Sequence, residues 1–211
     1  MYKNFVKRLI DIILSLIGAI VLLPVFLIVA ILIYADDPGP ILFKQKRVGK
    51  NKKIFWLHKF RSMKIKTPDV PTHLLDNPDQ YITKIGNIIR KFSIDELPQI
   101  YDILFGHMSI IGPRPALWNQ DDLIEERDRY GANDIKPGLT GWAQINGRDE
   151  LPIDVKAKFD GEYTEKLQSG GFTAFFMDLK CFFGTIIKVL QHDGVVEGAG
   201  SEKKEKEVAF R

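Results

Sequence analysis

The chain has little cysteine and almost no excess of charge, and both shortages limit what it can be. Its 211 residues contain one cysteine, Cys181, so a disulfide cannot form within the chain, which fits a reducing compartment. Lys and Arg number 30 against 27 Asp and Glu, and the formal net charge of +3 is too small for nucleic-acid binding through overall charge. We therefore expect one compact domain with an appendage, and no nucleic-acid partner.

Several motifs of common enzyme classes are also missing. The sequence has no Asp-x-Asp pair of the kind that many nucleotide-sugar transferases use for metal, and neither a G-x-x-x-x-G-K-[ST] nor a G-x-G-x-x-G loop. Its four histidines lack metal-ligand spacing, and there is no H-E-x-x-H motif and no Ser-centred nucleophile elbow. These absences argue against the common nucleotide-binding, zinc-hydrolase and serine-hydrolase classes.

Formal charge is absent from residues 12 to 34, which are mostly Ile, Leu, Val and Ala. As a helix this run would be about 35 Å long, enough to cross a hydrocarbon core of about 30 Å. Pro24 lies in its middle and predicts a kink. A cleaved signal peptide would have a shorter apolar region and a small-residue cleavage site, whereas residues 36–40, Asp-Asp-Pro-Gly-Pro, indicate an abrupt helix stop.

Basic residues flank this apolar run on both sides. Lys3, Lys7 and Arg8 precede it, and residues 44–66 after it hold ten basic side chains and no acidic one. A helix that simply spans a membrane should carry its positive charges mainly on the cytoplasmic side, whereas a bent helix that enters and returns keeps both flanks there. The pattern favours a re-entrant membrane helix over residues 1–37, with an ordinary spanning anchor as the alternative.

The rest of the chain predicts a small, helix-rich α+β domain over residues 38–196. Apolar runs at 41–43 and 54–57 around a basic turn predict a β-hairpin, and the proline-rich residues 67–80 predict a loop. Helical patterns follow at 81–92, 96–105, 117–131 and 152–167, and the glycine-rich residues 136–148 predict a structured loop. The strands are too few for a doubly wound sheet, and residues 197–211 predict a disordered tail.

A second apolar stretch, residues 172–190, carries Asp178, Lys180 and Lys188. These charges argue against a membrane span and predict an amphipathic helix. It could lie at a membrane interface or pack in the core, and ordinary burial preferences favour the core.

Residues 93–98, Ser-Ile-Asp-Glu-Leu-Pro, carry the strongest chemical signal. Ser93 followed by Glu96 fits a capping box, which is a purely structural interpretation. The same pattern allows chemistry, because a helix start can bind phosphate, and Asp95 with Glu96 offers hard oxygen ligands for Mg²⁺. An ionised Asp can also attack phosphorus and form an acyl phosphate.

Two further motifs contain basic residues, one between two prolines and one in a predicted strand. Arg114 lies between Pro113 and Pro115, which suits a pre-positioned phosphate clamp and equally suits the end of a helix. Strand alternation predicts that Lys59 and Arg61 share one face, where they could bind a substrate diphosphate, lipid headgroups or only water.

Together these residues resemble the bacterial sugar transferase family, the monotopic polyprenyl-phosphate phosphoglycosyl transferases, in their small, catalytic-domain-only form. The resemblance runs from about Tyr2 to Val195. It rests on the kinked apolar helix and on residues 38–40 (PGP), 45–49 (QKRVG), 59–63 (KFRSM), 93–99 (SIDELPQ), 106–115 (GHMSIIGPRP) and 137–148 (PGLTGWAQINGR).

The resemblance implies a reaction in two displacements. Asp95 matches the family nucleophile, which attacks a UDP-sugar, expels UMP and holds the phosphosugar until polyprenyl phosphate, usually undecaprenyl phosphate, takes it. Glu96 matches the partner acid that, with Asp95, would hold Mg²⁺. The expected substrate-binding residues are Lys59, Arg61, Arg90, Arg114, Arg148, Asp160 and Asp178, of which Arg61 comes from strand alternation and the others from the match to the family.

The resemblance also implies a re-entrant helix and a location at the cytoplasmic face of the bacterial inner membrane. The expected partners are UDP-sugar, polyprenyl phosphate and anionic lipid headgroups, with a second copy of the chain or downstream glycosyltransferases as candidate protein partners. Two other functions stay open on the residues alone: a membrane-bound Mg²⁺-dependent diphosphate hydrolase, and a non-enzymatic lipid-anchored assembly factor. The sequence does not identify the sugar.

Overall fold

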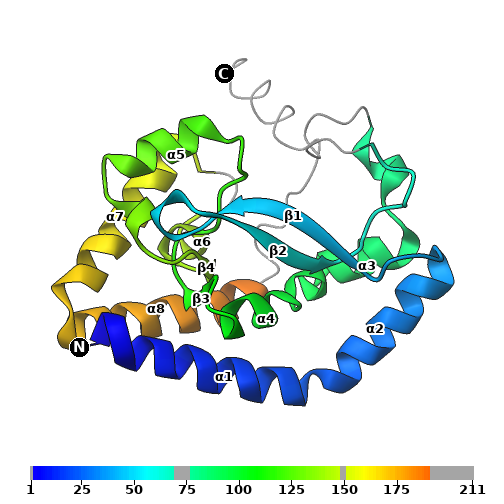
Figure 1. Ribbon diagram of the computed structural model, residues 1–211, viewed down its shortest axis with the longest axis horizontal. Coiled ribbons are helices and arrows are strands. Elements are labelled where there is room, and N and C mark those ends of the chain that lie inside the picture. Colours follow the sequence, from blue (N-terminus) through cyan, green and yellow to red (C-terminus); the bar gives the residue numbers. More distant parts are fainter. Residues whose placement is uncertain (1, 69–76, 148–150, 191–211) are drawn as a thin grey trace.

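The computed structural model describes residues 2–68, 77–147 and 151–190, and most of its elements are helices around two small sheets (Figure 1). The predicted helix-rich α+β class is thus confirmed. The expectations for Arg148 and for the tail at 197–211 lie outside the described residues.

The N-terminal apolar run forms a bent pair of helices. A π-helix, η1 (Tyr2–Val6), leads into α1 (Lys7–Val21), and α2 (Leu23–Asp36) turns away from them by 58°. Pro24 is the second residue of α2, where its missing N–H is tolerated, and the predicted kink is confirmed. Within the described ranges no single helix has the length and apolar character of a membrane span, although the bent pair together does.

Polar side chains connect both ends of the bent pair to the same domain. At the first end, Arg8 donates to the carbonyls of Ile103 and Leu104, and Asp11 accepts from Ser109 and from the Ile110 N–H. At the far end, Asp36 accepts from the Ile85 N–H, and Asp37 accepts from Arg61 and from the Ile65 N–H. The pair therefore follows the edge of the domain, as Figure 1 shows for α1 and α2.

The predicted hairpin is confirmed. β1 (Leu42–Val48) and β2 (Ile54–Phe60) pair antiparallel, with the turn η2 (Lys50–Lys52) between them. Phe55 and Leu57 point toward α4 (Gln99–Leu104), where they pack with Ile103 and Met108 in one buried cluster. Burial of these side chains places the end of β2 beside the turn that precedes α4.

A second sheet replaces the loop expected at 136–148. β3 (Ser109–Ile111) and β4 (Gly138–Thr140) are parallel, and α6 (Trp142–Ile145) follows directly. The expectation of a loop was therefore wrong for residues 138–140 and 142–145. A Cβ on Gly138 would lie 2.1 Å from the Gly112 nitrogen, so glycine at this position permits the two backbones to approach. Three-residue strands give too little alternation to be recognised from sequence.

The remaining elements complete the domain. They are η4 (Pro78–Tyr81), α3 (Lys84–Lys91), η5 (Ile94–Glu96), α5 (Asp121–Asp128), η6 (Ala132–Asp134), α7 (Ile153–Ser169) and α8 (Gly171–Leu190). The helix predicted at 152–167 corresponds closely to α7, whereas the pattern at 117–131 overestimated α5.

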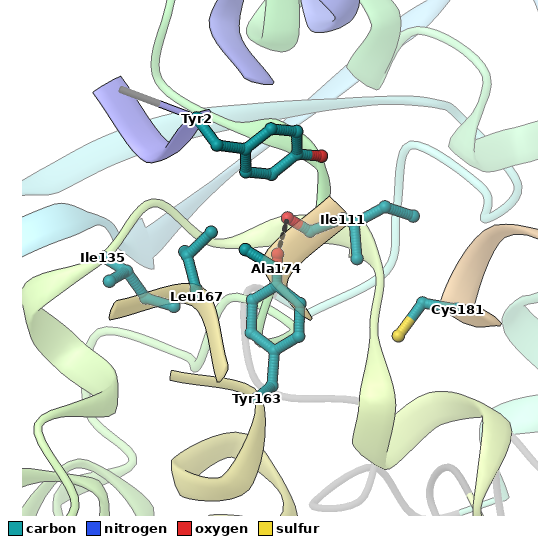
Figure 2. Packing of buried hydrophobic residues seen from close by; sticks show 7 residues of the cluster. All are labelled: Tyr2, Ile111, Ile135, Tyr163, Leu167, Ala174 and Cys181. Atoms are coloured by element: carbon teal, nitrogen blue, oxygen red, sulfur yellow. Dashed lines mark hydrogen bonds between the residues drawn. The ribbon is translucent and has the colours of Figure 1, made fainter. Parts of the chain in front are cut away.

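The main core joins the N-terminus to the last two helices. Figure 2 shows Tyr2, Ile135, Leu167 and Ala174 around Tyr163, whose hydroxyl donates to the Ile111 carbonyl at 3.1 Å. One face of α8 belongs to this core, so the predicted amphipathic helix and its packing in the core are confirmed. Its outer face exposes the large apolar side chains Phe172, Phe176, Phe183 and Ile187, and Phe175, Phe182, Ile186 and Val189 between the two faces are also exposed.

Candidate active site

Asp95 and Glu96 lie in the short 3-10 turn η5, between α3 and α4. Ser93 precedes the turn with φ of 54°, in the left-handed region, and its side chain makes no cap hydrogen bond. The expected capping box is therefore wrong: α4 begins only at Gln99, and the Glu96 N–H bonds to the Ser93 carbonyl instead. The reason is that the Glu96 side chain turns toward two cations.

Glu96 holds those two cations at the same time. Lys59, from β2, donates to Oε1 at 2.9 Å, and the Arg114 guanidinium contacts Oε1 at 2.7 Å and Oε2 at 3.3 Å. Burial alone would raise the pKa of Glu96, but the charges and hydrogen bonds of Arg114 and Lys59 outweigh it and hold this pKa well below its ordinary value. Glu96 is thus an ionised group that fixes two cations in place.

Asp95 lies beside this cluster. It is 6% exposed, and its Oδ2 is 4.0 Å from the Lys59 ammonium. The hairpin, the η5 turn and the Gly-Pro-Arg-Pro segment thus bring two carboxylates and two cations together. Such a cluster can hold a phosphate against its cations while a carboxylate faces the phosphorus.

Two cavities of different character meet at Arg114. The larger, about 240 Å³, is mostly apolar and is formed by η5, β3, β4 and the second half of α8; its walls include Glu96, Leu97, Ile110, Leu139, Phe182, Ile186 and Val189. The smaller, about 110 Å³, has four cations in its walls: Arg47, Arg114, Arg127 and Lys156. A ligand with a charged end and an apolar end would find both environments here.

Comparison with known proteins decides the family. A family model described as bacterial sugar transferase matches residues 2–192. The chain belongs to the bacterial sugar transferase family. The resemblance seen in the sequence motifs is thereby confirmed.

Several relatives of this transferase cover most of its chain. It is 40% identical over 193 residues to the exopolysaccharide production protein PSS of Rhizobium leguminosarum bv. phaseoli, across 87% of this chain and 94% of that protein. It is 42% identical to the uncharacterized sugar transferase EpsL of Bacillus subtilis (strain 168), across 74% of this chain and 73% of that protein. It is 36% identical to the UDP-glucose:undecaprenyl-phosphate glucose-1-phosphate transferase of Escherichia coli (strain K12), across 88% of this chain and 40% of that protein.

The basic residues expected in the transferase site are not all together. Lys59 and Arg114 contact Glu96, and Arg90 lies in the last turn of α3, where its carbonyl accepts from the Ser93 N–H. Arg61 instead pairs with Asp37 at the end of α2, because β2 ends at Phe60 and the alternation stops there. A substrate-binding role for Arg61 stays a prediction, and its contacts indicate an anchor for α2.

The two expected acidic residues are buried in separate networks. Asp160 is 1% exposed and accepts from Arg127 at 2.8 and 2.6 Å, which holds Arg127 in the wall of the cationic cavity. Burial raises the pKa of Asp160, and the Arg127 charge opposes this. Asp178 accepts from the hydroxyls of Tyr2 and Tyr163 and from Lys7, so it fastens the N-terminus to α8.

Sequence reasoning missed four residues that line the cavities: Arg47, Arg127, Gln144 and Lys156. Arg47 and Gln144 lie within the motifs of the resemblance but were given no role, and Arg127 is indistinguishable from a surface charge until α7 brings Asp160 to it. One glycine of the 136–148 segment has a packing role. A Cβ on Gly141 would meet the Gly112 oxygen at 2.1 Å, so this glycine allows two site segments to pack together.

The carboxylates of the site suit Mg²⁺ only together with substrate. Among the described residues no group of three or more His, Cys, Asp or Glu side chains could hold a metal ion by itself. Asp95 and Glu96 supply hard oxygen ligands, and Mg²⁺ commonly takes one or two carboxylates plus substrate phosphates. The donor set fits the ion on that condition, although both Glu96 oxygens already contact cations.

Proposed function

We propose that this protein transfers a phosphosugar from a UDP-sugar to polyprenyl phosphate, releasing UMP and forming polyprenyl-diphospho-sugar, the first membrane step of glycoconjugate assembly. The observation that carries the proposal is the Asp95–Glu96–Lys59–Arg114 cluster, in which Glu96 lines the apolar cavity and Arg114 lines both the apolar and the cationic cavity. The names of the relatives support it, since they include undecaprenyl-phosphate transferases for glucose-1-phosphate and N-acetylgalactosamine phosphate. Because these sugars differ, the sugar used by this protein is left open.

Each cavity has the character of one substrate. The cationic cavity suits the diphosphate of the nucleotide sugar, because guanidinium groups bind phosphate oxygens in a two-point geometry. The apolar cavity suits the isoprene units next to the acceptor phosphate, because burying them removes apolar surface from water. Holding both phosphates at Arg114 would reduce the entropy loss and the repulsion that oppose their reaction.

The chemistry proceeds in two displacements at one phosphorus. A carboxylate oxygen of Asp95 attacks the phosphorus that bears the sugar; the bond to the UMP oxygen breaks, and UMP leaves with that electron pair. An oxygen of polyprenyl phosphate then attacks the same phosphorus, and the Asp95 carboxylate leaves unchanged. Lys59 and Arg114, fixed by Glu96, stabilise the charge on the phosphoryl oxygens in both steps.

Mg²⁺ is part of the proposal. The carboxylates of Asp95 and Glu96 would hold it, with substrate phosphates completing its shell. When bound, the ion neutralises phosphate charge and so assists the departure of UMP.

The membrane association is proposed from the exposed apolar surface. Leu16, Ile20 and Val21 on α1, and Leu27 and Ile31 on α2, are exposed, as is the outer face of α8. A surface of this kind marks a membrane contact. Since polar side chains fasten both ends of the bent pair to one domain, we infer a re-entrant helix whose ends both face the cytoplasm, at the bacterial inner membrane beside anionic lipid headgroups.

One experiment tests this function against its alternatives. Purified protein is incubated with a panel of UDP-sugars and Mg²⁺, first without and then with polyprenyl phosphate, and UMP is measured. The proposal expects at most one UMP per protein without acceptor and continuous release with it, both lost in Asp95→Asn and kept in Asp79→Asn, an exposed carboxylate on η4. Continuous UMP release without acceptor would identify a hydrolase, and no release with any UDP-sugar would leave the assembly-factor role.

A further inference from the structure

Gln144 lies where both cavities meet, yet its side-chain amide has no hydrogen-bond partner among the described residues. It belongs to α6 and, with Arg114, lines the apolar and the cationic cavity alike. Neither its amide nitrogen nor its amide oxygen has a hydrogen-bond partner in the part of the chain that the structure describes, and both atoms are shielded from solvent. A buried amide without partners costs stability, so its presence needs an explanation.

The backbone around Gln144 leaves room for this amide. A Cβ on Gly141, three residues earlier, would lie 3.0 Å from the Gln144 Oε1 and 2.1 Å from the Gly112 oxygen. Any larger residue at 141 would therefore crowd the amide and the segment that carries Arg114. Glycine at 141 thus leaves the Gln144 amide its space beside the segment that carries Arg114.

We propose that Gln144 is a substrate-binding residue for the nucleotide sugar, an inference that rests on the proposed function. Its amide nitrogen donates to an oxygen of the phosphate at Arg114, and its Oε1 accepts from a hydroxyl on the ring next to that phosphate. A phosphate oxygen can only accept from the amide, and a hydroxyl can donate to Oε1, so the nucleotide sugar satisfies both halves of the amide. Polyprenyl phosphate has no hydroxyl beside its phosphate and would leave Oε1 unpaired, which points to the donor substrate.

Two variants separate the parts of this interaction. Gln144→Met keeps the length of the side chain and removes both hydrogen-bonding functions. Gln144→Glu keeps an acceptor but replaces the donor with a negative charge that faces phosphate. With the UDP-sugar of the panel that the wild type uses best, we expect KM to rise about ten-fold or more in Gln144→Met and further in Gln144→Glu. The kcat of Gln144→Met should stay within about three-fold of the wild type, because the lost hydrogen bonds stabilise the bound substrate and the transition state equally.

Thermal stability distinguishes this role from a structural one. Because the amide has no partner within the described chain, Gln144→Met should melt at the wild-type temperature or above it. Asn133→Leu is the matched control, since the Asn133 amide is buried and donates to the Ile124 carbonyl at 2.8 Å and to Asp128 at 2.7 Å. It should lower the melting temperature and leave the KM for the UDP-sugar unchanged.

The outcomes distinguish failure of the role proposed for Gln144 from failure of the proposed transferase function. A wild-type KM in Gln144→Met, while the wild type releases UMP, would refute the role of Gln144 and leave the proposed function intact. A melting temperature that falls as in Asn133→Leu would show that the residue is structural. If the wild type releases no UMP from any UDP-sugar of the panel, the proposed function fails, and the role of Gln144 fails with it.

Discussion

Lys59 donates a 2.9 Å hydrogen bond to Glu96, and this contact joins the β-hairpin to the turn that carries Asp95. The two residues are 37 positions apart in the sequence. They meet because the hairpin packs on α4, the helix that follows the turn in the chain. Glu96 thereby fixes the ammonium group 4.0 Å from Asp95 Oδ2. In this arrangement Glu96 acts chiefly by positioning cations, and a metal would be an addition to that role.

Removing the Lys59 ammonium group should slow the chemistry. In Lys59→Met, we expect the rate of UMP release at saturating UDP-sugar to fall about 100-fold, because one preorganised donor to the phosphoryl oxygens is lost. The measurement is single-turnover UMP release. Lys44→Met is the matched control, since Lys44 is exposed on the neighbouring strand β1; an equal loss in both variants would contradict a specific role for Lys59.

Glu96 should make stability depend on pH in a definite direction. Its pKa is held well below the ordinary value of 4.5, so its stabilising contribution is present above pH 4.5 and is lost as the pH falls through the lower pKa of the folded protein. Glu96→Gln should therefore melt below the wild type at pH 7, since it removes the negative charge that Lys59 and Arg114 contact, and this difference in melting temperature should narrow on acidification.

Melting temperatures of both proteins from pH 7 to pH 3 provide the test. Glu125→Gln, at an exposed position of α5, is the matched control and should melt close to the wild type. A difference between the wild type and Glu96→Gln that is constant over the same range would contradict the ionised state assigned to Glu96.

The pairing of Arg61 with Asp37 predicts coupled effects. If Arg61 anchors α2, then Arg61→Met and Asp37→Asn should each reduce thermal stability, and the double variant should lose less than the sum of the two. The KM for UDP-sugar should stay near the wild-type value in all three. If Arg61→Met alone raises that KM, while Asp37→Asn does not, the residue binds substrate as strand alternation first suggested.

The elements that sequence could predict are those with long, regular patterns. The hairpin follows from two apolar runs around a basic turn, and α7 and α8 follow from helical periodicity over at least 17 residues. The kink at Pro24 follows from the missing N–H of a single residue. In each case the cause lies within the segment itself.

What could not be predicted depends on contacts between distant segments. The Ser93–Glu96 spacing fits a capping box, yet Lys59 and Arg114 draw the Glu96 side chain away from the turn. The parallel pairing of β3 with β4 needs Gly112 and Gly138 to meet across a long intervening segment. The role of Arg127 likewise appears only once α7 brings Asp160 to it.

The membrane arrangement can be tested by labelling single cysteines. Lys3→Cys, at the start of the bent pair, and Lys44→Cys, after it, should react with a membrane-impermeant thiol reagent from the cytoplasmic side only. Val21→Cys, 66% exposed near the bend, should be protected by lipid. Labelling of the first two from opposite sides would contradict a re-entrant helix. The native thiol should not interfere, because Cys181 is buried and burial raises its pKa to about 12.

The covalent step at Asp95 is the central claim, and intact-mass spectrometry tests it most directly. The full-length protein is mixed with its UDP-sugar and Mg²⁺ without acceptor, the reaction is quenched in acid, and the mass of the intact protein is measured. We predict a population heavier by one phosphosugar, which disappears when polyprenyl phosphate is added before the quench and never forms in Asp95→Asn. An unmodified mass in protein that demonstrably turns over with acceptor, or an adduct that persists in Asp95→Asn, would contradict the account.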